Sequence, residues 1–341
     1  MTIDQPRLHA VGGPEHVRKT FETALFEVKR RIVGQETMLE RVFVALLADG
    51  HVLLEGVPGL AKTMTIKTVA DVLGGSFKRI QFTPDLVPSD LVGTRIYRPD
   101  SGRFDTELGP VFCNFLLADE INRAPAKVQS ALLEVMQERQ VTIGHSTFPV
   151  PTPFLVLATQ NPIESEGTYP LPEAQVDRFM FKVVIDYPSE SEEAKVVDRS
   201  LEPAAEVEKV LSTEQLVQSQ HATSEIFVDR AVNEYAVALC TATRDPAKYG
   251  LGDLARFIEY GASPRGSIYL IHAGRALALL RGRGYVLPED VAALAHDVLR
   301  HRLVLSYEAL AEEVGADALI DRVLAAVETP TVSLSRSEAA A

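Results

Sequence analysis

The residues best suited to a chemical reaction lie in GVPGLAKT, the segment from Gly56 to Thr63. Glycines let the backbone curl so that its N–H groups face a polyphosphate, and a following helix adds partial positive charge. Lys62 would reach the β- and γ-phosphates, and the Thr63 hydroxyl would bind Mg²⁺. Ala61 replaces the last glycine of the usual G-x-x-x-x-G-K-[ST] pattern, and alanine is small enough for a first helical turn. A chance Gly/Pro turn is the alternative, which the strand-like segment before and the helical pattern after make less favourable.

Two carboxylates end the apolar segment FLLADE, from Phe115 to Glu120. Asp119 would hold Mg²⁺ through its water shell, and Glu120 would orient and polarise the water that attacks the γ-phosphate. A strand followed by an Asp-Glu turn is, taken alone, more often a solvated loop. Its position 56 residues beyond Thr63, in the same alternating region, favours nucleotide hydrolysis.

Three further side chains are candidates for contact with the γ-phosphate. Asn161 ends PFLVLATQN, where its amide could contact the γ-phosphate or the attacking water, although Asn-Pro is also a common turn. Arg265 follows a Ser-Pro helix start, where its charge opposes the helix dipole by roughly 0.3–1 kcal/mol, so we expect an anion or a nearby acid beside it. Arg178 could be an arginine finger for a neighbouring subunit, or could pair locally with Asp177 or Glu173.

The apolar pattern predicts the scaffold that must position these residues. After a flexible lead-in over residues 1–13, two amphipathic helices are expected in EHVRKTFETALFEVKRRI and ETMLERVFVALLADG. Strand-like and helical segments then alternate: HVLLEG, the helix Lys62 to Leu73, FKRIQF, VFCNFLLADE, the helix Ala126 to Gln137, PFLVLATQN and FKVVIDY. The alternation predicts an α/β domain over residues 14–188, with a mainly parallel sheet flanked by helices.

The strand pattern ends after residue 188. An acidic stretch, SESEEAKVVDRSLEP, is followed by helix-start signals at Ser212, at Ser263-Pro264 and at Pro288. We therefore expect an all-helical second domain over residues 189–328 and a flexible tail over residues 329–341.

Composition excludes several classes of protein. The 341 residues are 46% hydrophobic and 24% charged, which indicates a folded chain of two or three domains. A formal net charge of −13 opposes nonspecific attraction to nucleic acid and to anionic lipid. No apolar stretch approaches the roughly 18 residues of a membrane-spanning helix, and no secretion signal opens the chain. Because Cys113 and Cys240 alone cannot build a disulfide framework or a zinc site, the expected location is the cytoplasm.

With these residues assembled, the chain closely resembles the MoxR family of AAA+ ATPases over about residues 14–328. The resemblance rests on IVGQE (32–36), GVPGLAKT, LLADEINRAPAKVQSALLEVMQERQVTIG (116–144), ATQNPIESEGTYPLPEAQVDRF (158–179) and GASPRG (261–266). It implies an α/β P-loop NTPase core with a C-terminal helical lid. It also implies a homo-oligomeric ring, usually of six subunits, with ATP and Mg²⁺ at the interfaces. Ala61 is typical of that family.

The resemblance assigns a role to each candidate residue. Lys62 and Thr63 resemble the Walker A pair, and Asp119 and Glu120 the Walker B pair. Asn161 resembles sensor 1, Arg265 resembles sensor 2 and Arg178 resembles the arginine finger. The implied nucleotide contacts are Val33 and Gly34 at the adenine, and Gly56, Pro58, Gly59, Leu60, Ala61, Lys62, Thr63 and Met64 at the phosphates. Arg123 is expected to face the subunit interface.

The family also implies two insertions in the ATPase core. One would run from about Thr83 to Gly109 and interrupt the second helix, and the other would be a hairpin over residues 141–153. Hairpins that grip phosphates carry basic residues, whereas the second insertion has no Lys or Arg and the first has three Arg against five acids. We therefore expect both to contact protein. His145 has no His or Cys nearby and is expected to be a solvated loop residue.

The function implied by the resemblance is chaperone-like. The enzyme would hydrolyse ATP to remodel or mature protein complexes, for example in metalloenzyme cofactor insertion, usually with a partner that carries a von Willebrand factor A domain. A DNA-remodelling AAA+ motor is an alternative that the acidic charge disfavours. A nucleotide-gated scaffold that does not hydrolyse ATP is a second alternative. A small-molecule P-loop kinase is disfavoured because no acceptor pocket is evident.

Overall fold

The computed structural model describes residues 13–57, 59–60, 62–100, 102–162, 167–203 and 205–331. Its central sheet has five strands among these residues, in the spatial order β2-β5-β8-β1-β9. Their bounds are β1 Val52–Glu55, β2 Phe77–Gln81, β5 Phe115–Asp119, β8 Leu155–Gln160 and β9 Phe181–Val184. Every neighbouring pair is parallel, so the carboxyl ends of all five strands lie along one edge. The predicted α/β core with a parallel sheet is confirmed.

The sheet separates two hydrophobic cores because successive side chains of a strand point to opposite faces. In β5, Phe115 and Leu117 belong to one core, whereas Leu116 and Ala118 belong to the other. The first core continues without a break into the C-terminal helices. The second packs against α5 (Ala126–Glu138). Both faces of the inner strands are therefore buried, as their continuous apolar segments predict.

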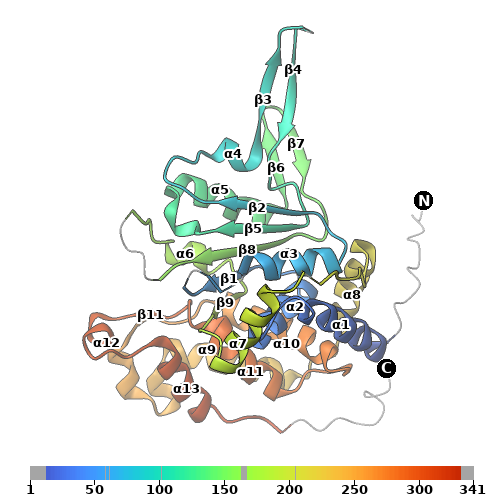
Figure 1. Cartoon of the computed structure of the whole chain (residues 1–341). Coiled ribbons are helices and arrows are strands. Elements are labelled where there is room, and N and C mark those ends of the chain that lie inside the picture. The colour runs from blue at the N-terminus through green and yellow to red at the C-terminus, as the bar shows by residue number, and fades with distance from the viewer. Residues whose placement is uncertain are drawn as a thin grey trace, which may run out of the picture.

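Two helices open the fold, as expected from the sequence. These are α1 (Pro14–Lys29) and α2 (Glu36–Leu47), and both contact α10 of the C-terminal region. Figure 1 shows them in blue beside the orange C-terminal helices, with α3 (Lys62–Val72) between them and the sheet. The segments predicted to be flexible, residues 1–13 and 329–341, lie outside the described residues except for residues 13 and 329–331, so that prediction is not tested.

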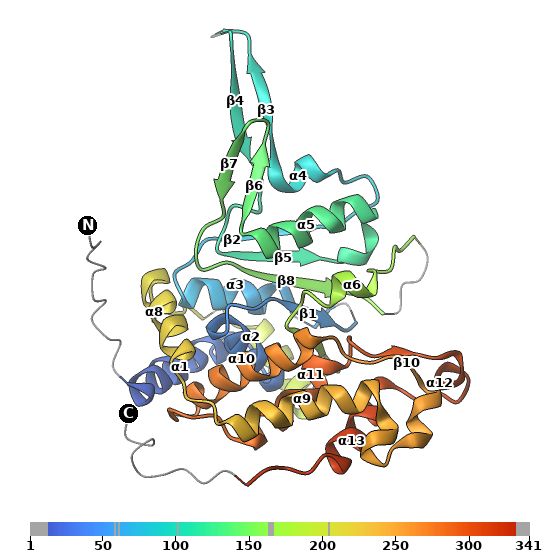
Figure 2. The same ribbon diagram turned by 180° about the vertical axis from the view of Figure 1, so that it is seen from behind.

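Both predicted insertions form antiparallel hairpins. The first contains α4 (Pro88–Val92), β3 (Gly93–Arg98) and β4 (Arg103–Leu108), and the second contains β6 (Gln140–Ile143) and β7 (Ser146–Pro149). Figures 1 and 2 show both projecting from the end of the core opposite the lid, with β3 and β4 reaching farthest.

The expectation that the first insertion interrupts a helix is wrong. The helix α4 precedes the hairpin, and residues 109–114 lead straight into β5 without a helix. The N–H groups of Gly109 and Val111 donate to the carbonyls of Val92 and Leu91. These two bonds close the base of the hairpin against α4.

The C-terminal region is a lid of helices. Its helices are α7 (Glu190–Ser200), α8 (Thr213–Ser224), α9 (Arg230–Arg244), α10 (Pro264–Leu280), α11 (Pro288–Leu299), α12 (Tyr307–Ala311) and α13 (Ala316–Ala326). The three predicted helix starts are confirmed, because Ser212 and Ser263 cap α8 and α10, and Pro288 opens α11. Across the residues that the structure describes, no helix has the length and apolar character needed to cross a membrane.

The expectation of an entirely helical lid needs one correction. The strands β10 (Ile258–Tyr260) and β11 (Val304–Leu305) form a two-stranded antiparallel pair. β10 is three residues long and β11 is two, and both are too short to show the alternation from which a strand is predicted. They pair because tertiary packing brings residues 44 or more positions apart in sequence side by side.

Candidate functional site

Three strand ends bring the candidate residues together. The strand β8 lies between β5 and β1, so Asn161 follows the strand that separates the two acids from the phosphate loop. Asn161 is itself buried. The carboxyl edge of a parallel sheet is where ligands bind in open α/β folds. The structure therefore brings Lys62, Asp119, Glu120 and Asn161 to one edge.

Two glycines of the loop between β1 and α3 have surroundings that suit phosphate binding. A Cβ added to Gly56 would lie 2.7 Å from the carbonyl oxygen of Ile185, so no larger residue fits there. Gly59 has φ = +90°, and apart from its chain neighbours no atom of the described residues lies within 4 Å of where its Cβ would be. This glycine leaves an open cradle that a phosphate would fill. Leu60 anchors the loop in the core, while Pro58 and Ala61 lie outside the described residues.

Lys62 begins α3 and lies among carboxylates. Its Nζ donates to the carbonyl oxygen of Gly56 at 2.5 Å. Burial lowers the pKa of Lys62, and the negative charges of Asp119, Glu120 and Glu55 act in the opposite direction. The ammonium group thus lies in the field of both candidate acids, as a lysine that bridges phosphates and acids should.

Asp119 is held by two side chains from neighbouring strands. Thr159 Oγ1 donates to one carboxylate oxygen at 2.5 Å, and Arg79 Nη2 donates to the other at 2.6 Å. The Arg79 side chain is 47% exposed. An incoming cation would compete with this arginine for Asp119.

Glu120 has a backbone conformation that few non-glycine residues adopt, with φ = +56°. Its N–H donates to Thr159 Oγ1 at 2.8 Å, which fixes the turn against β8. Its carboxylate accepts from Gln81 Nε2 at 2.8 Å and from Arg123 Nη1 at 3.0 Å. Arg123 therefore acts on Glu120 within its own subunit, and the expectation that it faces an interface stays a prediction.

Thr63 and Met64 follow Lys62 in the first turn of α3. Thr63 is half-buried and Met64 is 50% exposed. The Thr63 hydroxyl and the Asp119 carboxylate are oxygen donors, the type that Mg²⁺ prefers. The donor set at this edge therefore fits a Mg²⁺ ion bound together with phosphate oxygens.

The segment predicted to line the adenine lies next to the phosphate loop. Gln35 Nε2 donates to the carbonyl oxygen of Asp186 at 3.4 Å, and Gly34 packs against Glu192. Asp186 directly follows Ile185, which contacts Gly56. Val33 and Gly34 are half-buried here. A polar cavity of about 500 Å³ begins at Gln35 and extends between α2 and α11.

A second cluster of charge surrounds Asp177. Ser263 Oγ donates to the Asp177 carboxylate at 2.9 and 3.0 Å, and Arg265 Nη1 lies 3.3 Å from Oδ2. Arg302 Nε lies 2.9 Å from Oδ1. The acid that we expected beside Arg265 is therefore Asp177, and two guanidinium groups face this one carboxylate.

Arg178 follows Asp177 but makes different contacts. Its Nη1 donates to the carbonyl oxygen of Leu133 in α5 at 2.9 Å. Its Nε is buried and has no hydrogen-bond partner among the described residues. The local pair with Asp177 or Glu173 is thus not formed by this guanidinium within the described part of the chain.

Comparison with known proteins agrees with this geometry. A family model described as "ATPase family associated with various cellular activities (AAA)" matches residues 51–181, and one described as "AAA lid domain" matches residues 254–323. The chain is 58% identical over 314 residues to "Chaperone MoxR1" of Mycobacterium tuberculosis, which covers 92% of this chain and 83% of that relative. The chain belongs to the MoxR family of AAA+ ATPases.

A second MoxR protein and one solved structure also match this chain over most of its length. "Protein MoxR" of Paracoccus denitrificans is 35% identical over 320 residues, covering 88% of this chain and 93% of that protein. A crystal structure of a candidate ATPase from Cytophaga hutchinsonii has a TM-score of 0.89 and 47% identity, covering 93% of this chain and 97% of that one. The resemblance inferred from the motifs is therefore confirmed for the family and for the fold.

Several side chains around the site of this MoxR-family chain were not predicted from its sequence. At the strand edge they are Arg79, Gln81 and Thr159, and at the second cluster they are Tyr269 and Arg302; the bond from Ser263 to Asp177 was not predicted either. The polar positions of β2 are the one available signal, since Arg79 and Gln81 both fall on its exposed side. Arg302 gives no signal, because the two arginines in HDVLRHRLVL are typical of a solvated helix end.

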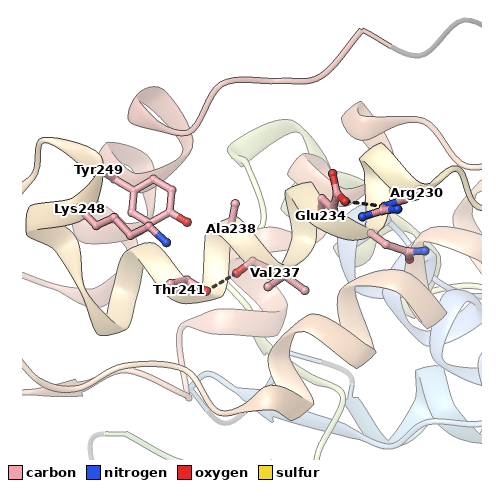
Figure 3. A pocket seen from close by; sticks show the side chains of 8 residues that line it. Arg230, Glu234, Val237, Ala238, Thr241, Lys248 and Tyr249 are labelled. Atoms are coloured by element: carbon pink, nitrogen blue, oxygen red, sulfur yellow. Dashed lines mark hydrogen bonds and ion pairs between the residues drawn. The ribbon is translucent and has the colours of Figure 1, made fainter.

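The other described parts of the chain were compared with this site. Among the described residues, no group of three or more His, Cys, Asp or Glu could hold a metal ion. His145 is exposed at the tip of the second hairpin, as predicted. Figure 3 shows a groove of about 340 Å³ on the lid, along α9 and the short helix η2 (Pro246–Tyr249), in which Arg230 pairs with Glu234. None of the predicted site residues lines it.

Proposed function

We propose that this MoxR-family protein hydrolyses ATP, with Mg²⁺, to remodel or mature protein complexes. The observation that supports hydrolysis best is the meeting of Lys62, Asp119 and Glu120 at one sheet edge. In this proposal Lys62 binds the phosphates and Glu120 orients the attacking water. Asn161, buried between them, donates its amide to the γ-phosphate or to that water.

Mg²⁺ would be held by Thr63 and Asp119 together with phosphate oxygens. When bound, the ion would neutralise charge on the phosphates. Asp119 would exchange the Arg79 guanidinium for the cation, while Thr159 keeps its hydrogen bond to the other oxygen. Glu120 stays oriented throughout by Gln81 and by its backbone bond to Thr159.

Arg178 is proposed to act on the ATP of a neighbouring subunit. Its Nη1 donates to the Leu133 carbonyl, while its Nε has no hydrogen-bond partner among the described residues, so part of the guanidinium is left to bind an acceptor outside them. Arg265 flanks the same segment through Asp177, so both arginines would approach one anion. A head-to-tail interface that pairs this cluster with the phosphate loop of the next subunit generates a ring, which we propose to be hexameric.

The proposed client is a protein rather than a nucleic acid. Two of the three arginines of the first hairpin are engaged locally, because Arg98 lies 3.4 Å from Asp105 and Arg95 lies over the ring of Phe104. Tyr97 and Phe104 are 52% and 58% exposed, and such apolar surface suits a protein partner. A partner with a von Willebrand factor A domain, a metalloenzyme client and a cytoplasmic location are part of this proposal.

The first test is the solution mass of the Glu120→Gln variant by light scattering, with and without Mg-ATP. We expect a shift from 37.3 kDa toward six times that mass, about 224 kDa. Phosphate release by the unaltered protein is measured in parallel, because a ring without turnover would indicate a nucleotide-gated scaffold. A monomer in saturating ATP contradicts the proposed ring. Salt-sensitive DNA binding would favour the DNA-remodelling motor.

A further inference from the structure

The segment that carries Arg178 is bound to the lid through its backbone. Four successive carbonyl oxygens, those of residues 177 to 180, accept hydrogen bonds from lid side chains. Arg302 Nη2 donates to Asp177 at 2.9 Å and to Phe179 at 2.6 Å, and Arg302 Nη1 donates to Met180 at 3.3 Å. Tyr269 Oη donates to the carbonyl oxygen of Arg178 at 3.2 Å. Backbone mobility at Arg178 is therefore limited by contacts from another part of the chain.

Arg302 is at the centre of these contacts and is fully buried. Its side chain is 0% exposed, and its guanidinium lies 5.0 Å from the centre of the Tyr269 ring. Burial lowers the pKa of Arg302 to about 10, while Asp177 acts in the opposite direction, so the group is protonated at neutral pH. A planar guanidinium can bind several acceptors at fixed angles, which a lysine ammonium cannot do.

Arg265 and Arg302 both lie beside the Asp177 carboxylate. Arg302 Nε lies 2.9 Å from one carboxylate oxygen of Asp177, and Arg265 Nη1 lies 3.3 Å from the other. Ser263, which caps the start of α10, also donates to Asp177. Arg302 thus contacts the backbone on both sides of Arg178 and shares a carboxylate with Arg265.

We propose that Arg302 is a positioning residue that fixes Arg178 and Arg265 relative to each other, so that the lid presents both to the ATP of the neighbouring subunit as one unit. This inference rests on the proposed function. Arg302 does not touch the nucleotide in this account. It acts because a catalytic charge displaced by about 1 Å loses on the order of 100-fold in rate.

The direct test is the Arg302→Lys variant, which keeps the positive charge but loses the planar guanidinium that binds several acceptors. We expect kcat for ATP to fall about 10- to 100-fold while KM changes less than about twofold, because Lys62 and the phosphate loop of the same subunit are unchanged. The matched control is Arg283→Lys. Arg283 also makes a forked pair with a buried carboxylate, Asp290, but lies entirely within the lid. We expect Arg283→Lys to keep kcat within about twofold at a similar loss of thermal stability.

A mixing experiment separates positioning in trans from a general loss of structure. Arg302→Lys subunits retain a working phosphate loop, and Glu120→Gln subunits retain a working Arg178. In equimolar mixed rings, about a quarter of the interfaces combine the two intact halves. We expect these mixtures to hydrolyse ATP faster than either variant alone. Arg178→Ala mixed with Glu120→Gln is the reference, and it should recover in the same way.

The outcomes distinguish this inference from the function on which it rests. Recovery with Arg178→Ala but not with Arg302→Lys overturns the role of Arg302 alone. Failure of both mixtures rejects an arginine finger in trans and the positioning role with it. If Arg302→Lys does not fold, Tyr269→Phe replaces it, since this variant removes one bond to the Arg178 carbonyl and keeps the ring. A kcat unchanged by Tyr269→Phe would then reject the proposal.

Discussion

Two carboxylate centres in this chain are held in opposite ways. At the sheet edge, Asp119 and Glu120 are held by Arg79 and Arg123, whose side chains are 47% and 42% exposed. At the second cluster, Asp177 is held by an arginine whose side chain is 0% exposed. Exposed ion pairs contribute about 0–1 kcal/mol, whereas removing one partner of a buried pair costs about 3–5 kcal/mol. The first centre can therefore exchange its partners at little cost, and the second cannot.

In the proposed function, the sheet edge binds the nucleotide and its cation, whereas the Asp177 centre positions Arg178 and Arg265. A site that takes up a cation and nucleotide must release the groups that hold its acids, and Arg79 can move into solvent. A group that serves a neighbouring subunit must keep its place when nothing is bound, and Asp177 is fixed from the lid. We therefore expect substitutions at the sheet edge to change turnover with little change in stability. Substitutions at the Asp177 centre should change both.

The largest expected effect is that of Arg178→Ala. If this residue stabilises charge on the neighbour's phosphates, kcat should fall about 10³-fold or more, with nucleotide affinity nearly unchanged. Steady-state phosphate release and binding of a fluorescent nucleotide measure the two quantities. Arg230→Ala is the control, because Arg230 is 91% exposed on α9. A loss of less than tenfold would leave Arg178 as a structural residue bound to Leu133.

A slightly smaller loss is expected for Glu120→Gln. Removing a general base that orients water costs about 10²- to 10⁴-fold in kcat, and the glutamine can still accept from Gln81 and Arg123. ATP binding should persist, whereas Lys62→Ala should lose it. Glu134→Gln on the exposed side of α5 is the control. Normal phosphate release by Glu120→Gln would remove this residue from the reaction.

The folded chain should lose stability at low pH through a buried histidine of the core, His51. His51 is buried, its Nδ1 accepts from the N–H of Val156, and its carbonyl accepts from Met180. Burial, followed by the charge of Arg139, lowers the pKa of His51 to about 3 from 6.5. Below pH 6.5 the unfolded chain binds a proton that the folded chain does not, so stability falls as pH decreases toward 3 and is unaffected by this group above 6.5.

Chemical denaturation at several pH values measures this effect. From pH 6.5 to 5 we expect the free energy of unfolding to fall by about 2 kcal/mol through His51, at about 1.4 kcal/mol per pH unit. The half-buried His301, whose pKa is also lowered by burial of its ring, adds to this change. The His51→Gln variant should be less stable at pH 7 but less sensitive to acid. Equal pH dependence in both proteins would contradict the assignment.

The smallest expected effect is that of Arg79→Ala. This arginine competes with Mg²⁺ for Asp119, and exposed pairs contribute about 1 kcal/mol or less. The Mg²⁺ concentration for half-maximal ATPase activity should therefore decrease by no more than about fivefold. Arg123→Ala tests the neighbouring pair and should act on kcat instead. A higher Mg²⁺ requirement for Arg79→Ala would show that this arginine supports the cation.

The sheet edge was largely predictable because its chemistry is local in sequence. Gly56 to Thr63 follows one strand and Asp119-Glu120 follows another, and parallel strands place their carboxyl ends together. The helix starts at Ser212 and Ser263 were predictable for the same reason, since a cap lies within three residues of the groups it binds. The pair β10 and β11 was not, because its segments show no pattern of their own.

By itself the sequence determined the family, the α/β core with its helical lid and the residues at the phosphate loop and the two acids. These features depend on apolar periodicity and on contiguous motifs, which every segment carries wherever it lies in space. Only the tertiary structure decided that Arg79, Gln81 and Thr159 hold the acids and that Arg302 binds the Arg178 segment. Arg302 and Asp177 are 125 positions apart, and no local pattern marks a pair that forms only when the lid packs on the core.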